Sequence, residues 1–149
     1  MRGSLAAAIT ACLVLTGTAS AQETGYSLSI RFDAGSAAKL ARLGERVIVA
    51  AWYYGEPTAA GRRHADEMGL VNIGREEAEI WPVNQTVTLG GALRGAPLTW
   101  VTEPMVNVNV YSARIADENN LLNCSLVDEP LAEARRAVSR IDCALIYPD

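Results

Sequence analysis

The sequence is short of the residues that most metal and catalytic sites use. Its 149 residues include one histidine and three cysteines. Zinc sites draw on several His and Cys ligands, and a Ser-His-Asp or Cys-His relay would have to use His64. This residue lies in a polar segment beside Arg62 and Arg63, whose charge disfavours the imidazolium form that a general base must reach. We expect His64 to be a solvated loop residue, and the chain to hold no metal and no cofactor.

Several motifs of catalysis and ligand binding are also missing. The chain has no G-x-S-x-G elbow of a serine hydrolase, no glycine-rich loop ending in Lys-Ser or Lys-Thr for phosphate, and no C-x-x-C-H for haem. Its carboxylates lack EF-hand spacing. The alternative that stays open for a metal is a carboxylate calcium site, at Asp66 and Glu67 or at Asp117 and Glu118.

An enzyme would have to use His64 or a pair of carboxylates. Glycoside hydrolysis uses two carboxylates, and Glu76, Glu77 and Glu79 are near one another in the sequence. On one strand Glu77 and Glu79 point the same way and Glu76 the opposite way, so a solvated face is the simpler interpretation. We therefore do not expect an enzyme.

The charge balance is acidic and contains no basic run. The chain has 13 Lys and Arg against 17 Asp and Glu, a formal net charge of -4. Nucleic-acid binding depends on Lys and Arg that neutralise phosphates, so a nucleic-acid partner is excluded. No apolar run reaches the about 20 residues of a transmembrane helix, so we expect no transmembrane segment.

The first 21 residues have the organisation of a secretory signal peptide. Arg2 supplies a positive start, residues 5–15 an apolar run, and Ala19-Ser20-Ala21 a small-residue cleavage site. We predict an exported chain, periplasmic or secreted, with one β-rich domain at 22–149. Ile9-Thr10-Ala11-Cys12 also resembles a lipoprotein cleavage box, and a lipidated Cys12 is the alternative.

After signal removal two cysteines remain, Cys124 and Cys143. An even pair in an oxidising compartment predicts a disulfide. Residues 121–127 read as a strand, Asp128 as a helix N-cap, and Leu131, Ala134, Val138 and Ile141 recur at helical spacing. A helix that folds back along the strand would bring Cys143 beside Cys124.

Alternation of apolar and polar residues predicts most other elements. Residues 26–32 and 105–113 alternate as half-buried strands, and 47–54 form a continuous apolar run that predicts a strand covered on both faces. Asp33 can cap a helix that ends at Gly44. Further strands are expected at 77–81, 85–89, 98–102 and 144–147, with a long surface connection at 58–74. The pattern predicts a mainly β fold, a small antiparallel β-sandwich of immunoglobulin-like or transthyretin-like type with one or two short helices and one disulfide.

Aromatic and amide side chains are the best candidates for ligand binding. Trp52 and Tyr54 near one strand end offer rigid contact area for a carbohydrate or a peptide. Asn107, Asn109 and Tyr111 share one face of another strand, and amides in the middle of a strand face water or bond a ligand directionally. The alternative is that the aromatic residues belong to the core.

The opening of the predicted domain resembles a known family. A strand followed by D-x-x-x-A-A-K-L at 33–40 and G-x-x-V-x-V-x-A at 44–51 is similar to the start of the periplasmic domain of bacterial cytochrome c biogenesis proteins of the haem-ligation system. The resemblance implies a small periplasmic sandwich that binds an apocytochrome. It covers about the first third of the chain after the signal peptide, and the half with Cys124 and Cys143 departs from it.

We therefore expect a non-enzymatic binding module for a protein, a peptide or a glycan. Two alternatives stay open. One is an inhibitor of a secreted enzyme, with loop 58–74 as the inserting element, and the other is a structural envelope protein.

Overall fold

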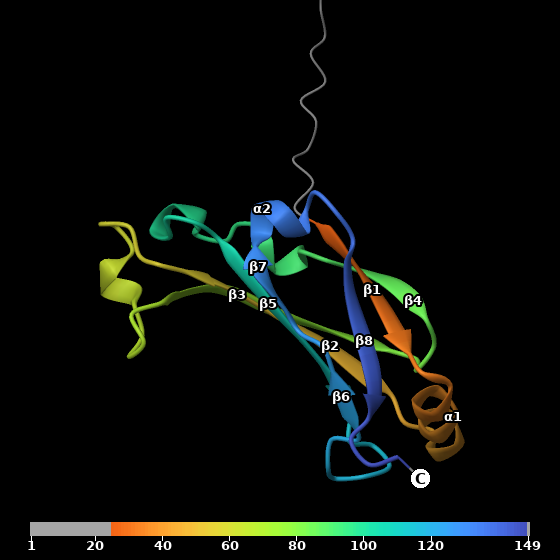
Figure 1. The fold of residues 1–149 in the computed structure, drawn as a ribbon. Helices are drawn as coiled ribbons and strands as arrows, with labels where there is room; N and C mark the ends of the chain where they lie inside the picture. The colour runs from red at the N-terminus through yellow and green to blue at the C-terminus, as the bar shows by residue number, and fades with distance from the viewer. Residues whose placement is uncertain (1–24, 149) are drawn as a thin grey trace, which may run out of the picture.

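The structure is a computed structural model, which describes residues 25–148. The predicted signal peptide at 1–21 and Cys12 lie outside the described residues. The described part of the chain is a small β-sandwich of two four-stranded sheets with two short α-helices and one disulfide (Figure 1). The predicted mainly β fold is confirmed. No helix within residues 25–148 is long and apolar enough to cross a membrane.

Each sheet combines strands that are far apart in the sequence. The first sheet has the order β4 (Gln85–Leu89), β1 (Tyr26–Phe32), β8 (Ser139–Leu145) and β6 (Leu122–Cys124). The second has the order β3 (Val71–Ile80), β2 (Val47–Gly55), β5 (Met105–Ser112) and β7 (Val127–Pro130). Strands β1 and β8 run parallel, and the other paired strands run antiparallel.

The core forms where the inward-facing residues of the two sheets meet. Alternate residues of β1 and β2 are buried, because successive side chains of a strand point to opposite faces. The fully buried apolar side chains include Leu28, Ile30, Val47, Val49, Tyr53, Val106, Val108 and Ile141. Burial of this apolar surface is the main force that holds the sheets together.

Helix α1 (Ala34–Leu43) carries the chain from the first sheet to the second. The Asp33 carboxylate accepts the Ser36 backbone N–H at 2.7 Å, and Gly44 ends the helix with φ 69°. Both caps occur as predicted from the sequence. Leu40 is buried, so the helix packs its apolar face against the sandwich.

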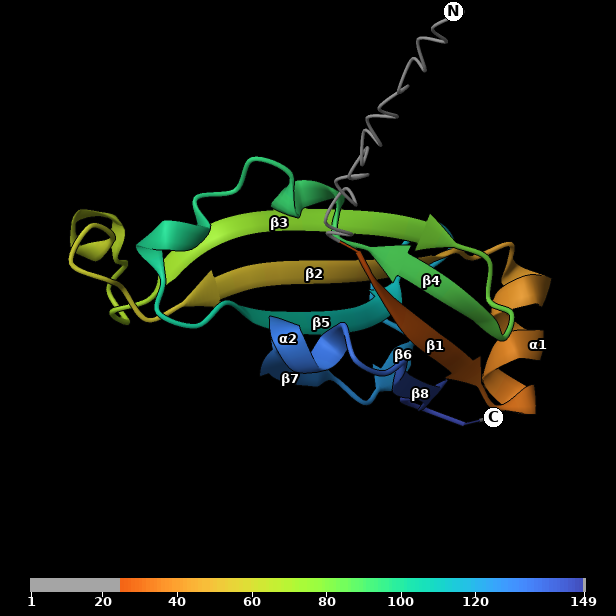
Figure 2. The same ribbon diagram turned by 90° about the horizontal axis from the view of Figure 1, so that it is seen from above.

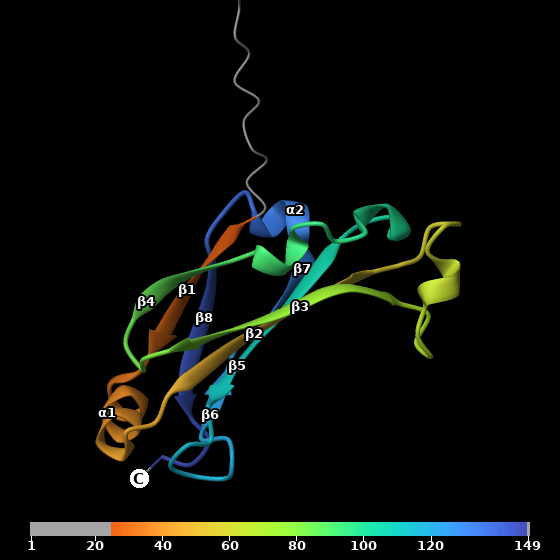
Figure 3. The same cartoon turned by 180° about the vertical axis from the view of Figure 1, so that it is seen from behind.

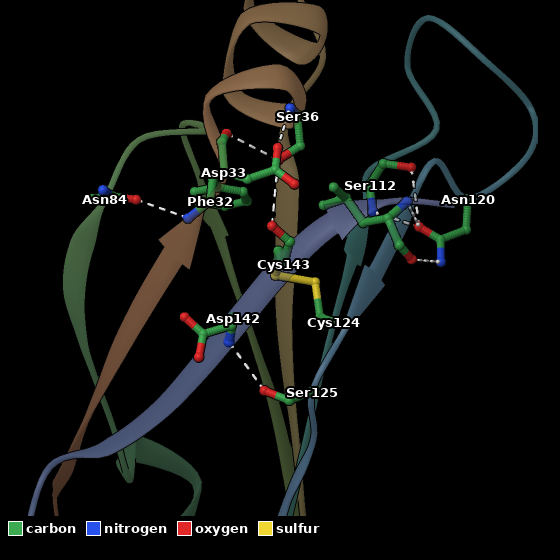
Figure 4. Close-up of a disulfide and its surroundings, with 11 residues drawn as sticks. Phe32, Asp33, Ser36, Asn84, Ser112, Asn120, Cys124, Ser125, Asp142 and Cys143 are labelled. Atoms are coloured by element: carbon green, nitrogen blue, oxygen red, sulfur yellow. Dashed lines mark hydrogen bonds between the residues drawn. A yellow bond between two sulfur atoms is a disulfide. The ribbon is translucent and has the colours of Figure 1, made fainter. Parts of the chain in front are cut away.

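The disulfide joins two strands of the first sheet directly. Cys124 of β6 is opposite Cys143 of β8 in the antiparallel pair, with their Cα atoms 4.0 Å apart (Figure 4). The Cys143 carbonyl accepts the Asp33 backbone N–H at 3.2 Å, which fixes this strand to the start of α1. The predicted disulfide is confirmed.

The predicted route between the two cysteines is wrong. Helix α2 (Leu131–Ala134) has only four residues, and Ile141 and Cys143 belong to β8. Asp128 caps no helix, since it lies in β7 opposite Asn107. Ile141 fits both a helical series and an alternating one, and the neighbouring β1 supplies the backbone partners that make it a strand.

Three other expectations from the sequence need correction. Strand 121–127 is divided into β6 and β7, which belong to different sheets. The expected strand 98–102 is replaced by the 3₁₀ helix η3 (Leu98–Trp100), and β3 starts at Val71, inside the segment that was expected to be a loop.

Strands β2, β3 and β5 continue past the first sheet (Figures 2 and 3). At that end the chain forms two loops, 56–70 with the 3₁₀ helix η1 (Arg62–His64) and 97–104 with η3. We call these two loops the arm. Their backbones bond to each other, with Thr58 N–H donating to the Trp100 carbonyl at 2.8 Å and Thr102 N–H to the Glu56 carbonyl at 2.9 Å.

Candidate functional site

The residues selected from the sequence lie together on the outer face of the second sheet. Trp52 of β2 is opposite Asn107 of β5, and Ala50 of β2 is opposite Asn109. The outward residues of β2 are only half-buried, whereas its inward residues are buried, so the prediction that this strand is covered on both faces is wrong. We call the outward residues of this sheet the open face: Ile48, Ala50, Trp52, Tyr54, Arg75, Glu77, Glu79, Met105, Asn107, Asn109, Tyr111 and Asp128.

A hollow of about 280 Å³ lies in the middle of the open face, with Trp52 among its lining residues. Its floor is the small side chain of Ala50, which lies on β2 between the larger neighbours Ile48 and Trp52. Arg75 and Glu77 from β3 flank it on one side, and Asn107 and Asn109 from β5 on the other. The hollow therefore results from a small residue surrounded by larger ones on three adjacent strands.

Trp52 forms the wall of this hollow. Its ring stacks on that of Tyr54, with the ring centres 4.4 Å apart and an interplanar angle of 21°. Tyr54 and Ala50 flank Trp52 on the same face of β2, so the ring side away from Tyr54 faces the hollow. The indole N–H of Trp52 is buried and has no hydrogen-bond partner among the described residues. A buried donor without a partner costs free energy. Since this N–H is closed to solvent, Trp52 can offer a ligand its ring and not its N–H.

Two tyrosine–carboxylate hydrogen bonds cross the strands of the open face. The Tyr54 hydroxyl of β2 donates to Asp128 of β7 at 2.6 Å, across β5. The Tyr111 hydroxyl of β5 donates to Glu77 of β3 at 3.2 Å, across β2. The bond to the Asp128 carboxylate, helped by burial, raises the pKa of Tyr54 to about 12. Burial and then the Glu77 carboxylate raise the pKa of Tyr111. Both hydroxyls therefore stay protonated and hold the face rigid at neutral pH.

The side chains beside the hollow carry several groups that can recognise a polar ligand. Asn109 Nδ2 donates to Asn107 Oδ1 at 2.7 Å, which orients both amides and leaves further donor and acceptor positions on each. The guanidinium carbon of Arg75 lies 5.7 Å from the centre of the Trp52 ring, near the outer limit of a cation–π contact. The face combines one aromatic wall with amide, guanidinium and carboxylate groups.

Sequence reasoning did not identify Arg75 and Asp128 as members of this face. Arg75 lies on β3 opposite Trp52, and Asp128 on β7 opposite Asn107. Both placements come from strand pairing between segments distant in the sequence. No local pattern around either residue indicates its neighbour on the next strand, because alternation shows only on which face of its own strand a residue lies.

The carboxylates considered for catalysis have separate partners. Glu77 and Glu79 point to the open face and Glu76 points inward, as predicted. Glu77 accepts from Tyr111, and Glu79 pairs with Arg46 at 3.2 Å. Arg46 also stacks on Trp81, with its guanidinium carbon 3.4 Å from the ring centre. These two glutamates are thus held by different neighbours.

Glu76 closes a hydrogen-bonded cluster between the sheets. Its carboxylate accepts hydrogen bonds from the Tyr53 hydroxyl, from the Gly90 backbone N–H at 2.7 Å and from the Gly91 backbone N–H at 3.1 Å. The Tyr53 hydroxyl lies 3.2 Å from that of Tyr26. Burial raises the pKa of Tyr26 to about 12 and raises that of Tyr53 further. The cluster is protonated at both tyrosines and satisfies polar groups at one end of the core.

The single histidine belongs to the arm. His64 is exposed, and its ring stacks on that of Trp100 with the centres 3.7 Å apart. Arg63 Nε donates to His64 Nε2 at 3.0 Å. His64 thus contacts an aromatic ring and a guanidinium, which brace a loop and do not orient a catalytic base.

No group of three or more His, Cys, Asp or Glu within residues 25–148 is close enough to hold a metal ion. In the two segments considered for calcium, an aspartate carboxylate accepts backbone N–H groups of its own loop. Asp66 accepts the N–H groups of Met68 and Leu70 at 2.9 and 3.0 Å, and Asp117 accepts that of Asn119 at 2.8 Å.

No protein-family model, curated protein or solved structure matches this chain. The likeness of residues 33–51 to the cytochrome c biogenesis domain therefore stays a prediction.

Proposed function

We propose that the chain is an exported, non-enzymatic binding module that holds its ligand on the open face. The observation that carries the proposal is the hollow beside Trp52, in which an aromatic wall lies next to oriented amides and a guanidinium. Binding sites combine apolar contact area with a few placed polar groups in this way. The groups come from β2, β3 and β5, and the two tyrosine–carboxylate bonds link these strands to one another and to β7.

Export to the periplasm or the medium is part of this proposal. The signal-like residues 1–21 support it, and so does the Cys124–Cys143 disulfide, since structural disulfides persist mainly in oxidising compartments.

Site-specific photo-crosslinking tests the proposal in cells. A photoreactive amino acid is introduced at Asn109 on the open face and, as a matched control, at Arg140 on the outer side of β8 in the other sheet. We expect adducts at position 109 that are absent at position 140. Equal adducts at both positions, or none at 109, would contradict a ligand site on the open face.

The composition of the adduct then identifies the kind of ligand. A c-type apocytochrome polypeptide is the outcome that the resemblance of residues 33–51 predicts. The absence of any adduct is the outcome expected of a structural envelope protein.

An inhibitor of a secreted enzyme is the second candidate function, and the arm is the observation that favours it. Met68 at its tip is 72% exposed, while the loop behind it is braced by the His64–Trp100 stack. A rigid, projecting loop loses little conformational freedom on insertion into a partner's cleft. The same crosslinker at position 68 would then capture a hydrolase, and the open-face position would capture nothing.

A further inference from the structure

We propose that the ligand of the open face is a glycan, one sugar unit of which occupies the hollow against the Trp52 ring. This inference rests on the function proposed above. It names the chemical class of ligand that the geometry of the hollow favours over a polypeptide.

The apolar part of the site suits a sugar ring. A pyranose has C–H-rich sides that pack against an aromatic ring, and the ring side of Trp52 away from Tyr54 faces the hollow. The floor at Ala50 is a single methyl group, which leaves room for a flat ring to lie beside the indole. A volume of about 280 Å³ is at the small end of ligand sites, as expected for one unit of a longer chain.

The polar part of the site suits hydroxyl groups. Sugar hydroxyls both donate and accept, and the hollow offers amides that do both, a carboxylate that accepts and a guanidinium that donates. The four side chains are Asn107, Asn109, Glu77 and Arg75, and they flank the hollow from both sides.

The charges on the open face argue against a protein partner. Protein–protein interfaces are depleted of Glu and Asp, but Glu77 lies directly at the hollow, and Asp128 is opposite Asn107 on the neighbouring strand. The aromatic area at the centre is limited to Trp52 and its neighbour Tyr54. A neutral glycan can bond these charged groups through its hydroxyls without an opposing charge.

Titration with defined oligosaccharides tests the inference on the purified exported chain. The probes are cellohexaose, maltohexaose, chitohexaose and glycan strands freed from peptidoglycan peptides, and binding is followed by calorimetry and by tryptophan emission. We expect saturable binding of at least one probe. Trp52→Ala weakens it by about tenfold or more, and Trp52→Phe, which keeps a ring and loses the N–H, weakens it less.

A second variant keeps the test valid if Trp52→Ala fails to fold. Ala50→Leu fills the floor of the hollow and removes no polar group, and it should abolish binding while the thermal unfolding temperature stays near that of the wild type. Trp81→Ala and Asn123→Ala are the matched controls. Trp81 is exposed outside the hollow, and Asn123 is exposed on β6 of the other sheet, so both should bind like the wild type.

Two results separate this inference from the proposed function. If no probe binds and the crosslinker at position 109 captures a polypeptide, the open face is a binding site and the glycan inference is wrong. If no probe binds and position 109 captures nothing, both proposals are wrong. Binding that Ala50→Leu leaves intact would also overturn the inference, because the sugar would then lie elsewhere.

Discussion

One buried carboxylate, that of Glu45, orders the loop after β5. Its side chain is fully buried, and its oxygens accept the backbone N–H groups of Arg46 at 3.0 Å, Ile115 at 3.0 Å and Ala116 at 2.8 Å. Burial raises the pKa of Glu45, but the N–H donors lower it by more, so that the pKa lies below its usual value. The ionised form is therefore the one that stabilises the fold.

Replacing this carboxylate with an amide should destabilise the protein. In Glu45→Gln the NH₂ group faces backbone N–H donors, and we expect a loss of about 1–3 kcal/mol in the free energy of unfolding at neutral pH. Because the folded pKa is depressed, the wild type has the full contribution above the ordinary pKa of 4.5 and loses it as the pH falls through the folded pKa. Urea unfolding at several pH values measures both effects. An acid dependence that is the same in Glu45→Gln would contradict this role.

The tyrosines on and behind the open face should make the protein less stable as the pH rises above 10. The folded pKa values of Tyr54 and Tyr26 are raised to about 12 from an ordinary value of 10.0. Their contribution is therefore complete below pH 10 and is lost as the pH rises towards 12. In Tyr54→Phe we expect a shallower fall of stability over this interval, with the parts due to Tyr26 and the other tyrosines of raised pKa remaining. Unfolding curves together with tyrosinate absorbance measure it, and an unchanged slope would argue against the Tyr54–Asp128 bond.

At the scale of elements, the disulfide holds β6 in the first sheet. Strand β6 has three residues and pairs only with β8 among the described strands. The cysteines are 19 residues apart, and closing a loop of this length stabilises the folded state by about 3 kcal/mol in the chain-entropy model. The double variant Cys124→Ala, Cys143→Ala should lose about this amount in urea unfolding. The same loss should follow reduction of the wild type, and a reductant should have no effect on the variant.

The arm depends on one close approach between its two loops. A Cβ atom added to Gly61 would lie 1.9 Å from the Trp100 carbonyl oxygen, so Gly61→Ala must displace one loop. We expect weaker His64–Trp100 stacking and faster proteolysis within 58–70, with the sandwich intact. Gly35→Ala is the control, because its Cβ would meet only an ordinary contact at 3.5 Å. Equal cleavage rates in the two variants would show that the arm is not braced at this position.

At the scale of the whole molecule, export and disulfide formation can be read in one measurement. The intact mass of the chain from a periplasmic extract should correspond to residues 22–149 with two hydrogen atoms missing for the disulfide. A lipid attached to Cys12 would give a heavier chain that starts at residue 12, in keeping with the alternative cleavage box. Two free thiols in periplasmic material would contradict a structural role for the disulfide in the exported protein.

The architecture makes a binding face from segments that are distant in the chain. Residues of β2, β3 and β5 meet at the hollow, and Asp128 of β7 lies opposite Asn107 on the open face. The sheet order β3-β2-β5-β7 brings together strands that are far apart in the sequence. The long strands of this sheet extend beyond the first sheet, so the open face runs towards the arm (Figure 2). An extended ligand on the hollow would therefore have further surface along the same strands.

Local sequence patterns were enough to predict the elements that depend on residues close together in the chain. Alternation predicted β1 and β5, Asp33 and Gly44 predicted the ends of α1, and the even cysteine pair predicted the disulfide. The same alternation grouped Asn107 and Tyr111 on one face. Each of these signals depends on contacts within one strand, one helix end or one covalent pair.

Other features depended on pairing between strands. The segment that contains Ile141 and Cys143 is a strand and not a helix, because β1 and β6 on either side supply its backbone hydrogen-bond partners. Arg75 came to lie opposite Trp52 through the β2–β3 register. Side-chain periodicity shows which residues of a segment share a face, but backbone hydrogen bonds between distant segments choose its neighbours. The chain's own pattern thus indicated a sandwich with aromatic and amide residues on strands, and long-range strand pairing placed them around one hollow.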